Sequence, residues 1–303
     1  MNLLTLDKNV QIYPSKIRII PNDKIGKSFF NLSYLAFDGL VNGKTGNIIE
    51  KKNFKKVGDI HSSVGIKVTD GFSVTEPFDL YDGAVLSVCI SEWVEGNRYT
   101  TPSIIFRGLS GKVGRGDAEA SKYQYTEILK SVEKLMRTQA TFNLTEVCEN
   151  LGYNDGYPKK LVSTILPCQY LENITINGKH STIIYFTAES PLLTIANLKN
   201  GQLLSFDSTL LNIPHQQNTR LNVMIKTYAI IRVMEIEAHH LTPIITFDDL
   251  FKKCRIENAD KKIKQRARLS LIDFLTNLQS KSVIKSLIVE KKGARFRAIR
   301  IFY

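Results

Sequence analysis

A stretch near the C-terminus combines an apolar helical stripe with positive charge. Between residues 260 and 278, apolar side chains recur every three or four residues, as in a helix that buries one face. They are Ile263, Ala267, Leu271, Phe274, Leu275 and Leu278. Lys261, Lys264, Gln265 and Arg268 follow the same spacing on another face, near the helix start. The helix therefore has one side for a core and a basic side for a partner.

A basic β-hairpin is expected directly after this helix. Two apolar runs, residues 283–290 and 294–303, are separated by Lys291, Lys292 and Gly293, and glycine supplies the positive φ of a tight turn. Arg295, Arg297 and Arg300 lie on the return strand. A basic helix followed by a basic hairpin is typical of a winged helix, in which the helix enters the major groove and the hairpin contacts phosphates.

Positive charge is concentrated in this part of the chain. The 303 residues include 41 Lys and Arg against 29 Asp and Glu, a formal charge of +12. Residues 251–303 hold fifteen of the cations and four of the acids. A solvated surface would explain an ordinary lysine-rich helix, but here the surplus falls on two consecutive elements while the rest of the chain is almost neutral. This distribution favours a polyanionic partner, nucleic acid above all.

The sequence argues against a membrane-spanning or secreted protein. The longest apolar segment, residues 223–236, is interrupted by Lys226, Arg232 and Glu235, which argues against a membrane span. The first residues lack the basic and apolar regions of a secretory signal. The four cysteines are far apart and form no Cys-x-x-Cys pair, so reduced and buried thiols are expected. We expect a cytoplasmic protein with no membrane partner.

The chain divides into three parts. Residues 1–76 are expected to be an extended, β-containing segment, residues 77–189 a first winged-helix domain, and residues 190–303 a second, strongly basic winged-helix domain. The two domains show one plan: long helix, Thr-Pro turn, short helix, polar link, long helix, hairpin. The predicted fold class is therefore α+β, with two tandem winged-helix domains. Helices are expected over 80–93, 103–109, 144–151, 221–238 and 248–254 and from about 118–121, with strands over 163–166 and 203–206 and a hairpin over 174–186.

The second unit resembles the double-winged-helix initiators of iteron-bearing bacterial plasmids. Residues 221–232 are similar to the helix that opens the family's second domain, Thr246 to Phe251 to its Thr-x-x-x-Leu helix start, and residues 283–303 to its closing hairpin. The resemblance implies binding of double-stranded DNA at repeated origin sites, local melting, and recruitment of the host replication initiation and helicase machinery. It also implies monomer and dimer forms with different roles.

The predicted DNA contacts follow from the chemistry of phosphates and base edges. Cations on the hairpin would neutralise phosphates without reading sequence. Donors on the first turns of the helix would contact bases, with Arg268 suited to guanine and Gln265 to adenine. In the first unit the equivalent face is less basic, and we expect weaker or protein-directed contacts there. The predicted DNA-binding residues are Lys261, Lys262, Lys264, Gln265, Arg268, Lys291, Lys292, Arg295 and Arg297, with Lys112, Arg115 and Lys122 in the first unit.

Catalytic interpretations are weaker. His239 and His240 are adjacent, so their side chains diverge and do not make a metal site with Asp248 and Asp249. The glycine-rich residues 108–116 lack the Gly-x-x-x-x-Gly-Lys-Ser/Thr order of a phosphate-binding loop. We therefore expect a protein without enzymatic activity, metal or cofactor. Two alternatives to a plasmid initiator stay open: a transcriptional regulator with the same tandem domains, and a DNA-nicking replication enzyme.

Overall fold

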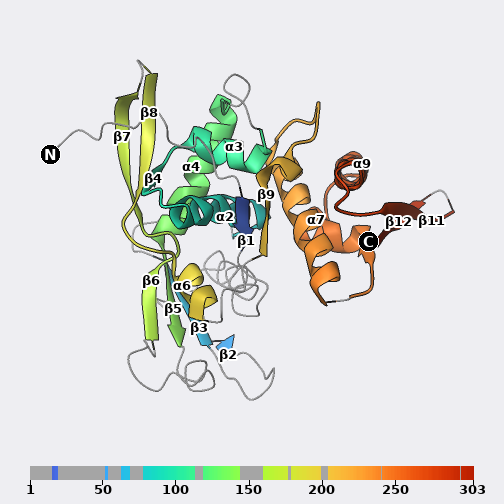
Figure 1. Ribbon diagram of the computed structural model, residues 1–303, viewed down its shortest axis with the longest axis horizontal. Helices are drawn as coiled ribbons and strands as arrows, with labels where there is room; N and C mark the ends of the chain where they lie inside the picture. Colours follow the sequence, from blue (N-terminus) through green and yellow to red (C-terminus); the bar gives the residue numbers. More distant parts are fainter. Residues whose placement is uncertain are drawn as a thin grey trace.

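The computed structural model of the chain describes residues 16–19, 52–53, 63–68, 78–112, 119–143, 160–176, 179–198, 204–239, 241–293 and 295–303. Helices and antiparallel sheets are mixed along the chain, so the predicted α+β class is confirmed (Figure 1). Within the described residues, two helix-and-hairpin units are joined by a two-stranded ribbon. The predicted helix at 144–151 and the turn at 177–178 lie outside the described residues.

The first unit contains three helices and a hairpin. Helix α2 (Leu80–Val94) starts at a capping box, in which the Asp79 carboxylate accepts hydrogen bonds from the backbone N–H groups of Tyr81 and Asp82 at 2.8 and 3.1 Å. Helices α3 (Pro102–Ser110) and α4 (Lys122–Arg137) start at the caps Thr101 and Ser121. These caps explain why the predicted helix starts are observed. The remaining elements are β4 (Tyr99–Thr100), β7 (Cys168–Ile176) and β8 (Lys179–Phe186).

The second unit repeats this order of elements. It consists of α7 (Arg220–His239), β10 (Ile244–Thr246), α8 (Phe247–Lys253), α9 (Lys261–Ser280), β11 (Ser286–Lys292) and β12 (Arg295–Phe302). Its sheet has the order β10-β12-β11, and the sheet of the first unit has the order β4-β8-β7. In both units the short strand therefore pairs with the last strand of the hairpin. The shared order and pairing make the two units architectural repeats.

A four-stranded sheet is inserted between α4 and β7 of the first unit. Its order is β2-β3-β5-β6. Strands β5 (Thr138–Asn143) and β6 (Lys160–Thr164) pair with each other, and β5 also pairs with β3 (Ser63–Val68) of the N-terminal segment, which in turn pairs with β2 (Lys52–Asn53). The sequence predicted extended structure before residue 77 but not its partners. Long-range pairing of this kind leaves no local signal in the sequence. The strand expected over 163–166 is observed earlier, as β6.

A ribbon of two strands lies between the units. Strand β1 (Lys16–Ile19) pairs antiparallel with β9 (Leu204–Asp207), which was expected over 203–206, and a 3-10 turn (Ser208–Leu211) follows. Helix α6 (Pro191–Leu198), which the sequence did not predict, precedes the ribbon. Helices α2 and α7 pack beside it, and the buried apolar residues of both units form one continuous core (Figure 1).

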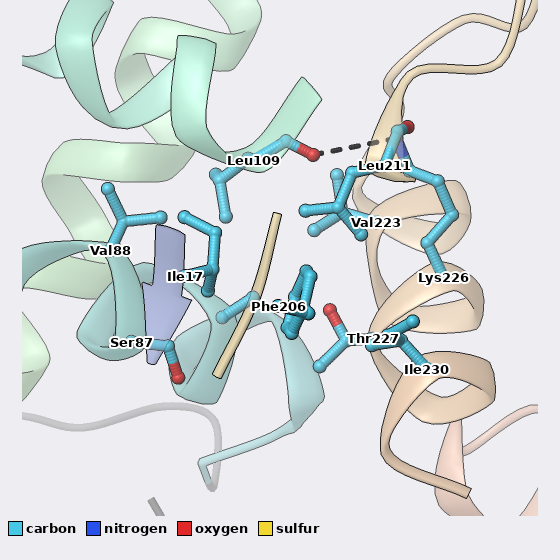
Figure 2. A pocket seen from close by; sticks show the side chains of 11 residues that line it. Ile17, Ser87, Val88, Leu109, Phe206, Leu211, Val223, Lys226, Thr227 and Ile230 are labelled. Atoms are coloured by element: carbon cyan, nitrogen blue, oxygen red, sulfur yellow. Dashed lines mark hydrogen bonds between the residues drawn. The ribbon is translucent and has the colours of Figure 1, made fainter. Parts of the chain in front are cut away.

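The buried side of α7 carries a lysine. The Lys226 side chain is 1% exposed and, with Ile17 and Phe206, lines the small space between α2 and α7 (Figure 2). Its Nζ donates to the backbone oxygen of Leu211 at 2.9 Å and to Oδ1 of Asn218 at 2.5 Å. Burial lowers the pKa of Lys226 to about 7. The lysine that interrupts the apolar pattern of this segment is therefore part of the junction, held by backbone and amide oxygens.

A glycine at the end of α3 allows the close approach of the turn that follows β9. Gly111 has φ of +67°, and a Cβ at this position would lie 2.5 Å from both the amide nitrogen of Asn212 and the backbone oxygen of Ser208. The start of the glycine-rich stretch therefore ends a helix and packs against the turn after β9. Residues 113–118, including Arg115, lie outside the described residues.

Candidate nucleic-acid interface

Helix α9 is held in place by its apolar face. Asp260 caps it, accepting a hydrogen bond from the N–H of Ile263 at 2.7 Å. Its fully buried side chains are Ala267, Leu271, Phe274, Leu275 and Leu278. They pack toward α7 and β11, and burial of each large side chain contributes about 1.5–3 kcal/mol. The stripe predicted from the sequence is therefore buried as expected, except that Ile263 is only half-buried.

The opposite side of α9 exposes Lys261, Lys262, Gln265 and Arg266, which together are called the α9 basic face. Arg266 was not among the predicted contacts, although its spacing of four residues from Lys262 placed it on the same side. None of the ion pairs found in the described part of the chain joins a cation of this face to a carboxylate. The positive charge of the face is therefore available to a partner.

Lys264 and Arg268 lie at the flank of α9, against α8. The Lys264 Nζ donates to the backbone oxygen of Glu257 and lies 5.8 Å from the ring centre of Phe251. The guanidinium carbon of Arg268 lies 4.9 Å from the Phe251 ring and 5.9 Å from the Phe247 ring. Both side chains are half-buried, because α8 covers this flank. The guanidinium predicted to contact guanine is therefore stacked beside aromatic rings, an arrangement that contributes about 0.5–1 kcal/mol.

The β11–β12 hairpin extends away from the helices of the second unit (Figure 1). Gly293 has the expected positive φ, +62°, and the register places Lys292 opposite Arg295 at the turn. Lys291 and Arg297 are exposed, and the Lys291 Nζ lies 5.2 Å from the ring centre of Phe296. The side chains of Lys292 and Arg295 lie outside those described.

One hairpin cation is neutralised within the hairpin. Arg300 donates through Nε and NH2 to Oε1 of Glu290 at 3.0 and 2.9 Å. Register shifts between Glu290 and Lys291, which marks a local irregularity in the strand. The charge available to a partner therefore lies on the outer part of the hairpin, with Lys291 and Arg297, rather than at Arg300.

The corresponding helix of the first unit, α4, is turned partly toward the junction. Lys122 and Tyr123 are exposed, with Tyr123 58% exposed. The Gln124 side chain donates to the backbone oxygen of Asn218 at 3.1 Å, and Glu127 accepts from Arg220 at 3.0 Å. Lys112 is half-buried and also contributes to the lowered pKa of Lys226. Of the three predicted cations in this unit, only Lys122 is exposed among the described residues.

No candidate metal site is found in the described residues, which contain no group of three or more His, Cys, Asp or Glu side chains arranged to hold a metal ion. Helix α7 ends at His239, and His240 lies outside the described range. Three cysteines, Cys89, Cys168 and Cys254, are buried and unpaired. No helix in the described ranges is both long enough and apolar enough to cross a bilayer.

Comparisons with known proteins do not assign the chain to a family. No protein-family model matches the sequence, and no curated protein matches it. Two crystal structures of RctB share 10% sequence identity with the chain. A selenomethionine derivative of RctB domains 2 and 3 gives a TM-score of 0.38 over 89% of this chain and 97% of that one. A second structure of RctB domains 2–3 gives 0.42 over 83% and 90%. At these TM-scores the likeness establishes neither a shared fold nor a shared function.

Proposed function

We propose that the protein binds double-stranded DNA sequence-specifically through two tandem winged-helix domains and initiates plasmid replication at repeated origin sites. The observation that carries this proposal is the α9 basic face, which is exposed while the opposite side of the same helix is fully buried. Donors projecting from a well-packed helix can reach base edges in a major groove without unfolding any part of the core.

The two parts of the second unit have different roles in this proposal. Lys262, Gln265 and Arg266 contact base edges, while Lys261, Lys264 and Arg268 lie closer to the phosphates. The hairpin cations Lys291, Lys292, Arg295 and Arg297 contact phosphates on either side of the groove and contribute affinity for any sequence. The shared order of elements in the two units supports a second, weaker DNA contact through Lys122 in α4, with Lys112 and Arg115 nearby in sequence.

The proposed protein acts by binding and carries out no chemical step. The resemblance to plasmid initiators, carried by residues 221–232, 246–251 and 283–303, further suggests a cytoplasmic protein that recruits the host helicase machinery and exchanges between monomer and homodimer. The helicase machinery and the second copy of the chain are part of the proposal through this resemblance, whereas the basic surfaces themselves call only for DNA.

A footprint of the purified protein on the DNA flanking its own gene tests the proposal. We expect protection of several direct repeats, each about two helical turns long. A plasmid that carries these repeats should replicate only when the protein is supplied. Protection of a single inverted repeat at a promoter, with no effect on replication, would instead indicate a transcriptional regulator. Metal-dependent cleavage of supercoiled DNA would overturn the non-enzymatic assignment.

A further inference from the structure

Leu269 is an apolar residue on the exposed side of α9. Its side chain is 46% exposed, and it is not among the residues that pack against the core. Single exposed leucines are common on protein surfaces. The position of this one is distinctive because Lys262, Gln265, Arg266 and Leu269 follow the i, i+3, i+4, i+7 spacing of a single row along a helix.

This row combines three hydrogen-bond donors with one apolar group. Lysine and arginine match the acceptors of guanine, and glutamine matches adenine. The apolar group that base pairs present in the major groove is the C5 methyl of thymine. Leu269 lies seven residues after Lys262, about 10 Å along the helix axis, a length that fits within a groove about 12 Å wide.

The next exposed residue of the row sets a limit on the contact. Asp273 lies four residues after Leu269 and is exposed. Its carboxylate would be repelled by phosphates if the helix continued along the groove. The part of α9 suited to DNA therefore runs from the helix start to Leu269 and ends with an apolar contact.

We infer that Leu269 contacts the methyl group of a thymine next to the bases contacted by Gln265 and Arg266, and so determines part of the target sequence. This inference rests on the proposed function, because it requires α9 to lie in a major groove. It assigns a specificity-determining role to Leu269. Truncating this side chain should leave the core intact, because the side chain is not packed against it. The predicted target contains at least one thymine whose 5-methyl group affects affinity.

The test begins with selection of preferred duplexes from a random pool by the full-length protein. Each thymine of the selected site is then replaced by deoxyuridine, which removes only the methyl group. We expect one replacement to weaken binding about fourfold, the effect of returning one apolar carbon to water. Leu269→Ala should weaken binding to the thymine duplex by a similar factor and bind the thymine and uracil duplexes equally.

Ile288→Ala provides the matched control, because Ile288 is an exposed apolar residue, 55% exposed, on the hairpin. This variant should keep the preference for thymine. The inference is overturned if no replacement affects the wild-type protein, if the selected site lacks thymine, or if Leu269→Ala still distinguishes thymine from uracil. Failure of the proposed function has a different signature, because the selection would then yield no duplex bound more tightly than random DNA.

Discussion

Arg220 of α7 binds Asp79, the cap of α2, with 2.7 Å between NH2 and Oδ2. The other oxygen of Asp79 caps α2, so one carboxylate fixes the start of a helix in the first unit and the start of a helix in the second. Arg220 also donates through NH1 to Glu127 of α4 at 3.0 Å, and its guanidinium carbon lies 4.7 Å from the Tyr81 ring centre. The arginine therefore connects three helices across the junction.

Replacing Arg220 with methionine should destabilise the whole fold. The substitution removes the guanidinium from the largely buried Asp79 and Glu127, of which Glu127 keeps its ion pair with Lys130 at 2.9 Å. Removing one member of a buried pair costs about 3 kcal/mol, so we expect a loss of that order from Asp79. Urea unfolding followed by circular dichroism measures this loss. Arg232→Met on the same helix is the control. The ion pair that Arg232 makes in the described part of the chain is with Glu235 of the same helix at 3.8 Å, so this variant should cost about 0.5 kcal/mol or less. Equal losses in both variants would show that Arg220 does not stabilise the junction.

Two double substitutions on α9 should separate base contacts from flanking contacts. Lys262→Ala with Arg266→Ala removes donors of the exposed face. We expect the ratio of specific to random DNA affinity to fall by at least tenfold, because a good base contact contributes about 1–3 kcal/mol of discrimination. Lys264→Ala with Arg268→Ala removes side chains that lie against Phe247 and Phe251. This second pair should weaken binding to all sequences and leave the ratio nearly unchanged.

Fluorescence anisotropy on the selected duplex and on a random duplex, at one salt concentration, measures both ratios. If only the Lys264 and Arg268 variant loses its discrimination between specific and random DNA, the base contacts are made by the flank of α9, as the sequence pattern predicted.

The hairpin should contribute affinity without sequence preference. Replacing Lys291, Lys292 and Arg295 with alanine should weaken binding to specific and random duplexes by the same factor. The slope of log affinity against log salt should decrease by about 0.9 for each phosphate that the hairpin no longer neutralises. Titrations at several salt concentrations measure the slope. Lys160→Ala, at the start of β6 in the four-stranded sheet, is an exposed control that should leave the slope unchanged (Figure 1).

Local signals in the sequence predicted the helices and hairpins well. Thr101, Ser121 and Asp260 cap the helices that their positions predict, and Gly293 forms the predicted turn. These features depend on neighbouring residues only, so the sequence pattern is sufficient to place them. Helix α6 is the exception, since the sequence pattern predicted no helix over residues 191–198.

Features that depend on residues far apart in the chain could not be predicted in this way. The pairing of β3 with β5 and the contact between Arg220 and Asp79 join segments separated by about seventy residues or more. The half-burial of Lys264 and Arg268, two of the four residues predicted for the basic side of α9, has a similar reason. They lie against Phe247 and Phe251 of α8, and no periodicity in the sequence specifies the position of that helix.

The buried Lys226 should make stability depend on pH above neutrality. Its pKa is about 7 in the folded protein, because burial disfavours the charged form and Lys112 adds repulsion, against an ordinary value of 10.5. Between these values the unfolded chain binds a proton that the folded chain does not. The contribution of Lys226 to the free energy of unfolding therefore rises with pH in this window, by about 1.4 kcal/mol per pH unit.

Lys226→Met should remove this contribution. The quantity to compare is the difference in free energy of unfolding between wild type and variant. It is measured by urea unfolding from pH 7 to about 8.5. This range lies below the pH at which cysteine thiols of the unfolded chain are mostly charged. The difference should grow in favour of the wild type as pH rises. Lys253→Met on the exposed side of α8 should give a difference that does not change with pH. Parallel stability curves for wild type and Lys226→Met would mean that the buried amine keeps its proton, held by the oxygens of Leu211 and Asn218.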